Sequence, residues 1–146
     1  MIVTTATATE MRDEEYRRLL EFRTGLRRFL HWSEEQAASA GLTAAQHQLL
    51  LAVRGHGDPA GPTIGDLAHH LLLRHHSAVG LVDRTEAAGL VRRVDDVQDA
   101  RIVRVALTAD GADRLAGLAS SHQAQLQRLV PRLQQLWRGL DPGDGR

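Results

Sequence analysis

The sequence has no cysteine, no lysine and no asparagine among its 146 residues. Without cysteine, the chain cannot form disulfides, thiolate metal sites or thiol-based redox switches. Without lysine, all 18 basic residues are arginines, and they are balanced by 18 acidic residues. The zero net charge gives no sign of a nucleic-acid partner, although a surface whose cations are all arginines suits contacts with phosphate.

Long apolar runs are also missing, because no segment approaches the roughly 20 apolar residues that span a bilayer. The first ten residues, MIVTTATATE, lack the basic region and apolar core of a secretory signal. We therefore expect a cytoplasmic protein that does not contact membranes, with one domain over residues 1–146. The sequence has no HExxH motif, nucleophile elbow or Walker loop, so we expect neither an enzyme nor a cofactor.

Two long amphipathic helices are predicted at the ends of the chain. Apolar residues recur at helical spacing over about residues 10–40 and again over about 109–140. Thirty helical residues would extend about 45 Å, beyond what a small domain covers, so both helices are expected to dimerise. Pro131 is expected to kink the second of them or to open a new turn at Val130.

A winged helix-turn-helix lobe is predicted between them, over about residues 43–107. Thr43 with Gln46, and Thr63 with Asp66, have the spacing of capping boxes at helix starts. A helix over 64–70, a tight turn and a helix over 74–88 outline a helix-turn-helix, in which the second helix buries Ala78, Leu81, Val82 and Thr85. Alternation over 90–94 and 101–107 then predicts a β-hairpin wing. The fold class is mainly α with this small hairpin.

Four short motifs carry a family resemblance over about Tyr16 to Leu140. They are Val82-Asp83-Arg84, Gly89-Leu90-Val91, a wing turn from Asp96 to Arg101, and Leu107-Thr108-Ala109-Asp110-Gly111. In this order and spacing they resemble the MarR family of winged-helix transcriptional regulators. The resemblance implies a homodimer that binds a pseudo-palindromic operator in double-stranded DNA, acts as a repressor and is released by a small aromatic or anionic ligand.

The resemblance also assigns residue roles. At the wing tip, Val97 replaces the family's usual proline and Ala100 a frequent arginine, so a softer, less cationic tip is expected. The chain stops six residues after Leu140, so dimerisation is expected to depend on the first and last helices. Asp99 is expected to join Asp83 and Arg84 in a salt-linked set that stiffens the wing against the recognition helix. The expected DNA-binding residues are Arg74, His75, His76, Ser77, Gly80, Arg84 and Arg101.

The paired histidines at the start of the recognition helix have two other interpretations. As metal ligands, His75 and His76 point about 100° apart on a helix and cannot chelate together. His69 and His70 would complete a site only through a particular turn geometry, so no metal is expected, and a metal-responsive regulator using the histidine cluster is an alternative. The second interpretation is that these histidines are simply solvated.

A ligand pocket has three candidate residues, His31, Trp32 and His47. His31 and Trp32 are better explained by packing in an interface, where tryptophan is often buried. Another alternative function is a winged-helix protein-interaction module without DNA binding, which the neutral charge and Ala100 would fit. No feature of the sequence identifies the ligand.

Overall fold

The computed structural model describes residues 10–138, and its elements fall close to where the sequence predicts them. Contacts divide the chain into two compact units. We call residues 32–123 the lobe, and the described parts of residues 1–31 and 124–146 the arm. No helix within the described range is long and apolar enough to cross a membrane.

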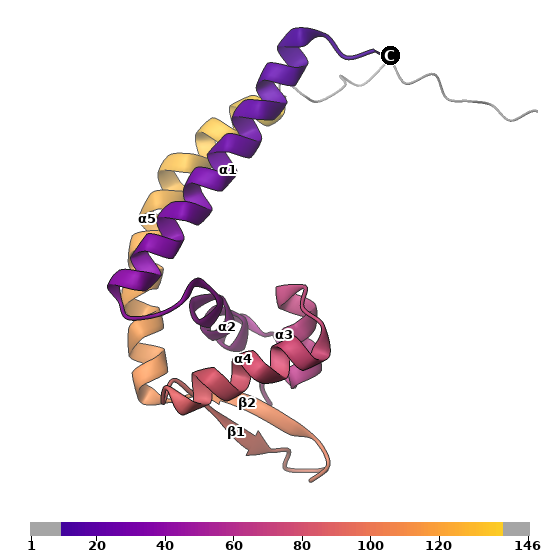
Figure 1. The fold of residues 1–146 in the computed structure, drawn as a ribbon, viewed down its shortest axis with the longest axis vertical. Helices are drawn as coiled ribbons and strands as arrows, with labels where there is room; N and C mark the ends of the chain where they lie inside the picture. The colour runs from indigo at the N-terminus through magenta and orange to yellow at the C-terminus, as the bar shows by residue number, and fades with distance from the viewer. Residues whose placement is uncertain (1–9, 139–146) are drawn as a thin grey trace, which may run out of the picture. The chain divides into compact units, whose positions relative to one another are not determined.

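The elements (Figure 1) are α1 (Asp13–Ser39), α2 (Ala44–Gly55), α3 (Ile64–Leu71), α4 (His75–Ala87), β1 (Val91–Asp95), β2 (Val103–Leu107) and α5 (Ala109–Arg138).

Both predicted capping boxes are confirmed. Thr43 Oγ1 accepts from the Gln46 backbone N–H at 3.1 Å, and the Gln46 side chain accepts from the Thr43 N–H at 3.0 Å. Thr63 and Asp66 make the same reciprocal pair at 3.1 and 2.9 Å. Each box satisfies two backbone donors that the first turn leaves open, which fixes where α2 and α3 begin.

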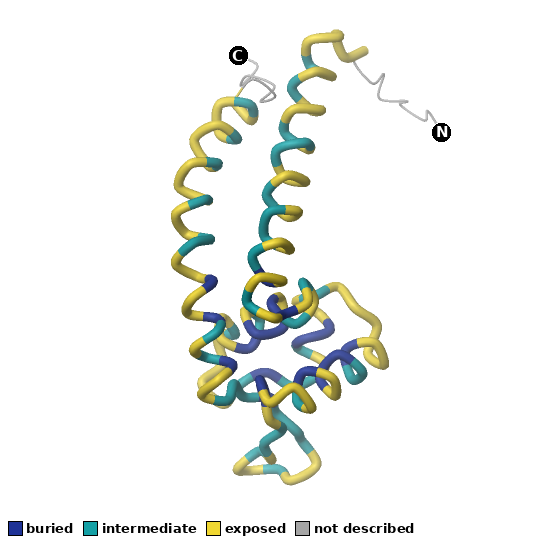
Figure 2. Tube along the Cα trace, turned by 60° about the vertical axis from the view of Figure 1, so that its left-hand side comes forward, coloured by how far each residue is buried: buried dark blue, intermediate teal, exposed yellow. Residues whose placement is uncertain are grey.

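The core lies in the lobe, where Figure 2 shows the buried residues gathered. The predicted inner face of α4 is confirmed, with Ala78, Leu81, Val82 and Thr85 all buried. The Thr85 hydroxyl donates to the Leu81 carbonyl at 2.7 Å, so the polar group is satisfied inside the core. The opposite face of α4 is thereby left to solvent. Other large side chains that are fully buried are Leu49, Leu50, Leu67, Leu90, Val91 and Val105.

The wing is an antiparallel hairpin attached to the lobe at its base. β1 pairs with β2 in a register that places Val91 opposite Leu107. The segment before α3 extends this sheet, because the Val105 N–H donates to the Pro62 carbonyl at 2.9 Å. β2 begins at Val103 rather than at the predicted Arg101, because Arg101 belongs to the turn and bonds Asp99.

A tight joint connects the wing to α5. The Thr108 hydroxyl donates to the Gly89 carbonyl at 2.6 Å and accepts from the Gly111 N–H at 3.1 Å. A Cβ atom on Gly111 would overlap the carbonyl group of Leu90. Glycine at 111 is therefore required by close backbone approach, which explains the Leu-Thr-x-x-Gly spacing.

In the arm, the described parts of α1 and α5 pack along each other. The Phe22 and Trp137 rings lie 6.2 Å apart, and Gly25 lets the Leu133 side chain approach its backbone. α5 runs through Pro131 to Arg138, so the predicted new turn at Val130 does not begin there. The last predicted leucine of this helix, Leu140, lies outside the described residues.

Candidate nucleic-acid interface

The N-terminal end of α4 presents polar side chains to solvent. Arg74 is the N-cap residue and makes no side-chain capping bond. An uncapped first turn leaves backbone N–H groups for an external acceptor, and a helix N-terminus favours an anion there. Arg74, His75, His76 and Ser77 are all exposed, as the sequence analysis expects.

The turn before α4 is set by Leu72, which adopts a left-handed conformation with φ 53°. Two bonds close the end of α3: the Leu72 N–H donates to the His69 carbonyl at 3.3 Å, and the Leu73 N–H to the Ala68 carbonyl at 2.9 Å. This is the usual way in which a helix ends on a left-handed residue, although glycine is the common choice. The turn thus fixes the point where the exposed end of α4 begins.

Gly80 and Arg84 act together on the outer part of α4. A Cβ on Gly80 would lie 3.3 Å from Arg84 Nη1, so the guanidinium group lies against the glycine. Gly80 is half-buried. Because it has no side chain, the Arg84 side chain can lie back over it, one turn along the helix. Arg84 is exposed and carries a positive charge in this region.

The predicted salt-linked set of Asp83, Arg84 and Asp99 is wrong. Asp83 instead accepts from Arg93 Nη2 of β1 at 2.6 Å, and Glu86 accepts from Arg93 Nη1 at 2.7 Å. Consecutive helical residues point about 100° apart, so Asp83 faces β1 while Arg84 lies over Gly80. The Arg93 backbone N–H and guanidinium hold the pKa of Glu86 below its usual value. The helix and the wing are therefore joined by Arg93.

Arg104 and Asp96 organise the base of the wing. Arg104 Nε donates to Asp96 Oδ1 at 2.7 Å, and Arg104 Nη1 donates to the Gly61 carbonyl at 2.7 Å. Asp96 also accepts from the N–H groups of Gln98 and Asp99, which closes the turn. The bond from Arg104, followed by those backbone donors, lowers the pKa of Asp96. This pair was not predicted from the sequence. The pattern that could have indicated it is an arginine in the second strand together with an aspartate at the start of the turn.

Arg101 is the exposed cation of the wing turn. Its side chain is 90% exposed, and it donates to both Asp99 carboxylate oxygens at 3.0 and 2.9 Å. The bond from Arg101 lowers the pKa of Asp99, so the pair is charged at neutral pH. Asp99 thus orients Arg101 while Arg93 and Arg104 attach the wing to the lobe.

Two of the three predicted pocket residues come together around a histidine that the sequence analysis missed. The rings of Trp32 and His47 each lie 4.8 Å from that of His122. His122 is held by the Leu118 carbonyl at 2.8 Å and by Ser33 Oγ at 2.7 Å. Burial, and then the charge of His122, lowers the pKa of His47. His31 is exposed in the arm, and a ligand role for these residues stays a prediction.

No group of three or more histidine, aspartate or glutamate side chains in the described part of the chain is placed to hold a metal ion.

Comparison with known proteins finds a family match within the lobe. Residues 40–102 match the model of the MarR family. The chain is 35% identical over 83 residues to the transcriptional activatory protein BadR of Rhodopseudomonas palustris, a match covering 56% of this chain and 47% of that protein. The match therefore spans about half the length of this curated relative.

Solved structures show the same fold. The MarR family regulator AbsC of Streptomyces coelicolor superposes with a TM-score of 0.72 at 23% identity, over 92% of this chain and 94% of that one. MepR of Staphylococcus aureus in complex with DNA gives 0.66 at 22% identity, over 75% and 78%. Residues 40–102 are thus similar to the MarR family, and the chain shares the winged-helix fold of a solved MarR family regulator along most of its length.

Proposed function

We propose that this chain is a sequence-specific DNA-binding transcription regulator that acts as a homodimer. One observation carries the proposal. α4 buries Ala78, Leu81 and Val82 and exposes an uncapped, polar N-terminal end, and the same lobe carries a wing with an exposed arginine. A recognition helix needs this division, because its inner face must be fixed while its outer face meets a groove. MepR, which has the same fold, has been solved with DNA.

The residues divide by the kind of DNA contact. Phosphate contacts position a protein, and base-edge contacts specify the sequence. His76 and Ser77, in the first turn of α4, are proposed to reach base edges in the major groove. Arg101 is proposed to lie along the minor groove, where a narrow groove attracts arginine. Arg74, His75 and Arg84 are proposed to contact the DNA backbone. Gly80 is proposed to leave space for such contacts.

The arm is proposed to form the dimer. Its side chains Leu20, Leu30 and Trp137 are 61%, 58% and 62% exposed. Apolar exposure of this extent marks an interaction surface in a folded protein. A two-fold dimer presents two recognition helices, which matches a pseudo-palindromic site.

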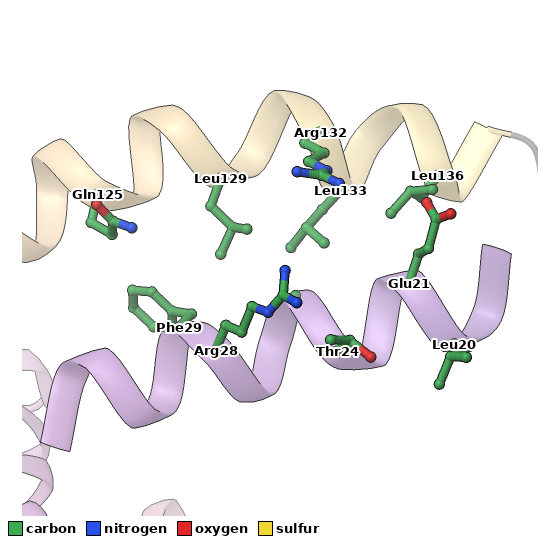
Figure 3. A pocket seen from close by; sticks show the side chains of 11 residues that line it. Leu20, Glu21, Thr24, Arg28, Phe29, Gln125, Leu129, Arg132, Leu133 and Leu136 are labelled. Atoms are coloured by element: carbon green, nitrogen blue, oxygen red, sulfur yellow. The ribbon is translucent and has the colours of Figure 1, made fainter. Parts of the chain in front are cut away.

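The two arm helices leave a hollow between them of about 470 Å³. In Figure 3, Leu129 and Leu133 of α5 point toward α1, from which Phe29 and Arg28 extend. A second copy of the arm is the proposed occupant, because the apolar side chains of the hollow continue into the exposed leucines of α1.

Selection from a random duplex library tests DNA binding directly. We expect enrichment of a pseudo-palindrome whose half-sites lie about one helical turn apart, with affinity that falls as salt rises. No binding to any duplex even at low salt would instead favour the protein-interaction module. Repression and release by a small aromatic or anionic ligand stay predictions. Because BadR is named as an activatory protein, run-off transcription from a promoter that carries the selected site measures the sign of regulation.

A further inference from the structure

His56 and His70 form an imidazole pair outside the proposed DNA-binding surface. His56 Nδ1 and His70 Nε2 are 3.0 Å apart, and the ring planes are nearly perpendicular, at 78°. His56 is the residue that ends α2, and His70 lies in the last turn of α3. Two nitrogen atoms from different elements are thus brought close enough to share one small cation.

A carboxylate lies behind the first ring. His56 Nε2 is 3.6 Å from Asp66 Oδ2, and the same Asp66 oxygen accepts from the Thr63 N–H at 2.9 Å. The capping box therefore fixes the carboxylate before any ion arrives. At 3.6 Å the contact is an ion pair and not a hydrogen bond, and a carboxylate on the outer side of an imidazole favours the tautomer whose inner nitrogen is free to bind a metal. His70 adds a favourable position, because the carbonyl end of a helix attracts a cation.

We propose that His56 and His70 bind one divalent transition-metal ion per chain, with Asp66 orienting His56 and water completing the coordination. The side chain of His56 is only 16% exposed, whereas His70 is exposed and has room to turn its lone pair toward the ion. Two protein ligands agree with the absence of any group of three in the described residues. His75 and His76, which follow each other in the first turn of α4, are not ligands of this ion.

The ligand set indicates which metals fit. The 3.0 Å contact between the two nitrogens is a hydrogen bond, so the exposed His70 ring must turn before both lone pairs face one ion. Two imidazoles completed by water make a nitrogen and oxygen set, which suits Cu²⁺ and Ni²⁺ in tetragonal coordination, whereas Zn²⁺ sites usually have three or four protein ligands. Cu²⁺ and Ni²⁺ are therefore favoured over Zn²⁺.

The ion would connect the loop after α2 to the last turn of α3, just before the left-handed Leu72. Because a ligand that binds only the folded state stabilises it, Cu²⁺ or Ni²⁺ should raise the melting temperature of the lobe. This effect requires no DNA, so the metal site and the proposed regulatory function can fail independently.

The test is a titration of the full, tag-free chain with Cu²⁺ and Ni²⁺ by calorimetry, with electron paramagnetic resonance of the Cu²⁺ complex. We expect one ion per chain with coupling to two nitrogen nuclei. His56→Asn and His70→Asn should each weaken binding at least tenfold and leave one coupled nitrogen. The matched control His75→Asn should bind metal as the parent chain does.

A further variant separates orientation from ligation. Asp66→Asn keeps an oxygen for the Thr63 cap but removes the charge, so binding should weaken less than in His56→Asn. Circular dichroism of each metal-free variant checks that it is folded. Equal binding by His70→Asn and the parent chain, loss of binding in His75→Asn, or tighter binding of Zn²⁺ than of Cu²⁺ and Ni²⁺ would overturn the proposal.

Discussion

Arg104 and Asp96 are joined at the base of the wing by a 2.7 Å bond, and their side chains are only 18% and 13% exposed. A charged pair withdrawn from water is held in one geometry and is costly to break by removing one partner. Arg104 also donates to the Gly61 carbonyl, so this one side chain connects the wing turn to the segment before α3. The orientation of the wing therefore depends on it.

Asp96→Asn should lower the melting temperature at neutral pH, because the amide keeps the shape of the carboxylate but not its charge. The pKa of Asp96 is lowered in the folded state, so its stabilisation is present above the ordinary aspartate pKa and is lost as pH falls through the lowered value. Thermal melts from neutral pH down to about pH 3 should show the two proteins converging below about pH 4. A constant difference at every pH would contradict this. The control is Asp110→Asn, whose exposed pair with Arg114 should matter little.

Arg101→Ala should weaken binding to all duplexes and reduce the salt dependence by about one counterion, because the residue acts on phosphate and groove potential. Fluorescence anisotropy at several salt concentrations measures both quantities. Asp99→Asn is the matched opposite change, since it frees Arg101 from a carboxylate at 2.9 Å and should steepen the salt dependence. If affinity and slope are the same in Arg101→Ala as in the parent chain, the wing does not touch DNA.

His76→Ala and Ser77→Ala should each cost about 1–3 kcal/mol on the selected site and little on a scrambled duplex, as expected of base-edge contacts. His75→Ala should lose affinity on both duplexes, because it is assigned to the DNA backbone. Parallel titrations against the two duplexes check this. If His76→Ala and Ser77→Ala lose the same affinity for both duplexes, these residues position the protein on DNA and do not recognise its sequence.

Leu20→Glu should convert the dimer to a monomer, because a charge would be buried in the proposed interface. Light scattering at micromolar concentration measures the mass. Leu51→Glu is a close control. Leu51 is 56% exposed, against 61% for Leu20, but it lies in the lobe, so this variant should remain a dimer. A stable monomer in the parent chain would contradict the proposed assembly.

His47→Gln should flatten the pH dependence of stability between about pH 7 and pH 5. Burial lowers the pKa of His47 in the folded state, so the unfolded chain takes up the proton first and stability falls as pH drops through this range. Melting temperatures of both proteins across the range provide the measurement. A parallel fall in both proteins would contradict the assignment of the effect to His47.

The sequence predicted those parts of the fold that local chemistry determines. The pairs Thr43–Gln46 and Thr63–Asp66 lie three residues apart, so their spacing alone placed two helix starts. It did not reveal the partner of Asp83, because Arg93 approaches only when β1 packs beside α4. In the same way, His122 was one polar residue on a helix until folding placed Trp32 and His47 against it.

Gly111, pressed against the Leu90 carbonyl, bears on the genetics of the protein. Any missense change at its codon adds at least a Cβ, so a screen for lost regulation should recover this position although it is not among the residues assigned to DNA. A misfolded chain cannot assemble with a wild-type copy, which makes such alleles recessive. Under the proposed function, changes at the exposed His76 should leave folding and dimer assembly intact and inactivate mixed dimers, so those alleles should be dominant. Dominance in a diploid test strain would thereby distinguish the fold from the interface without purifying the protein.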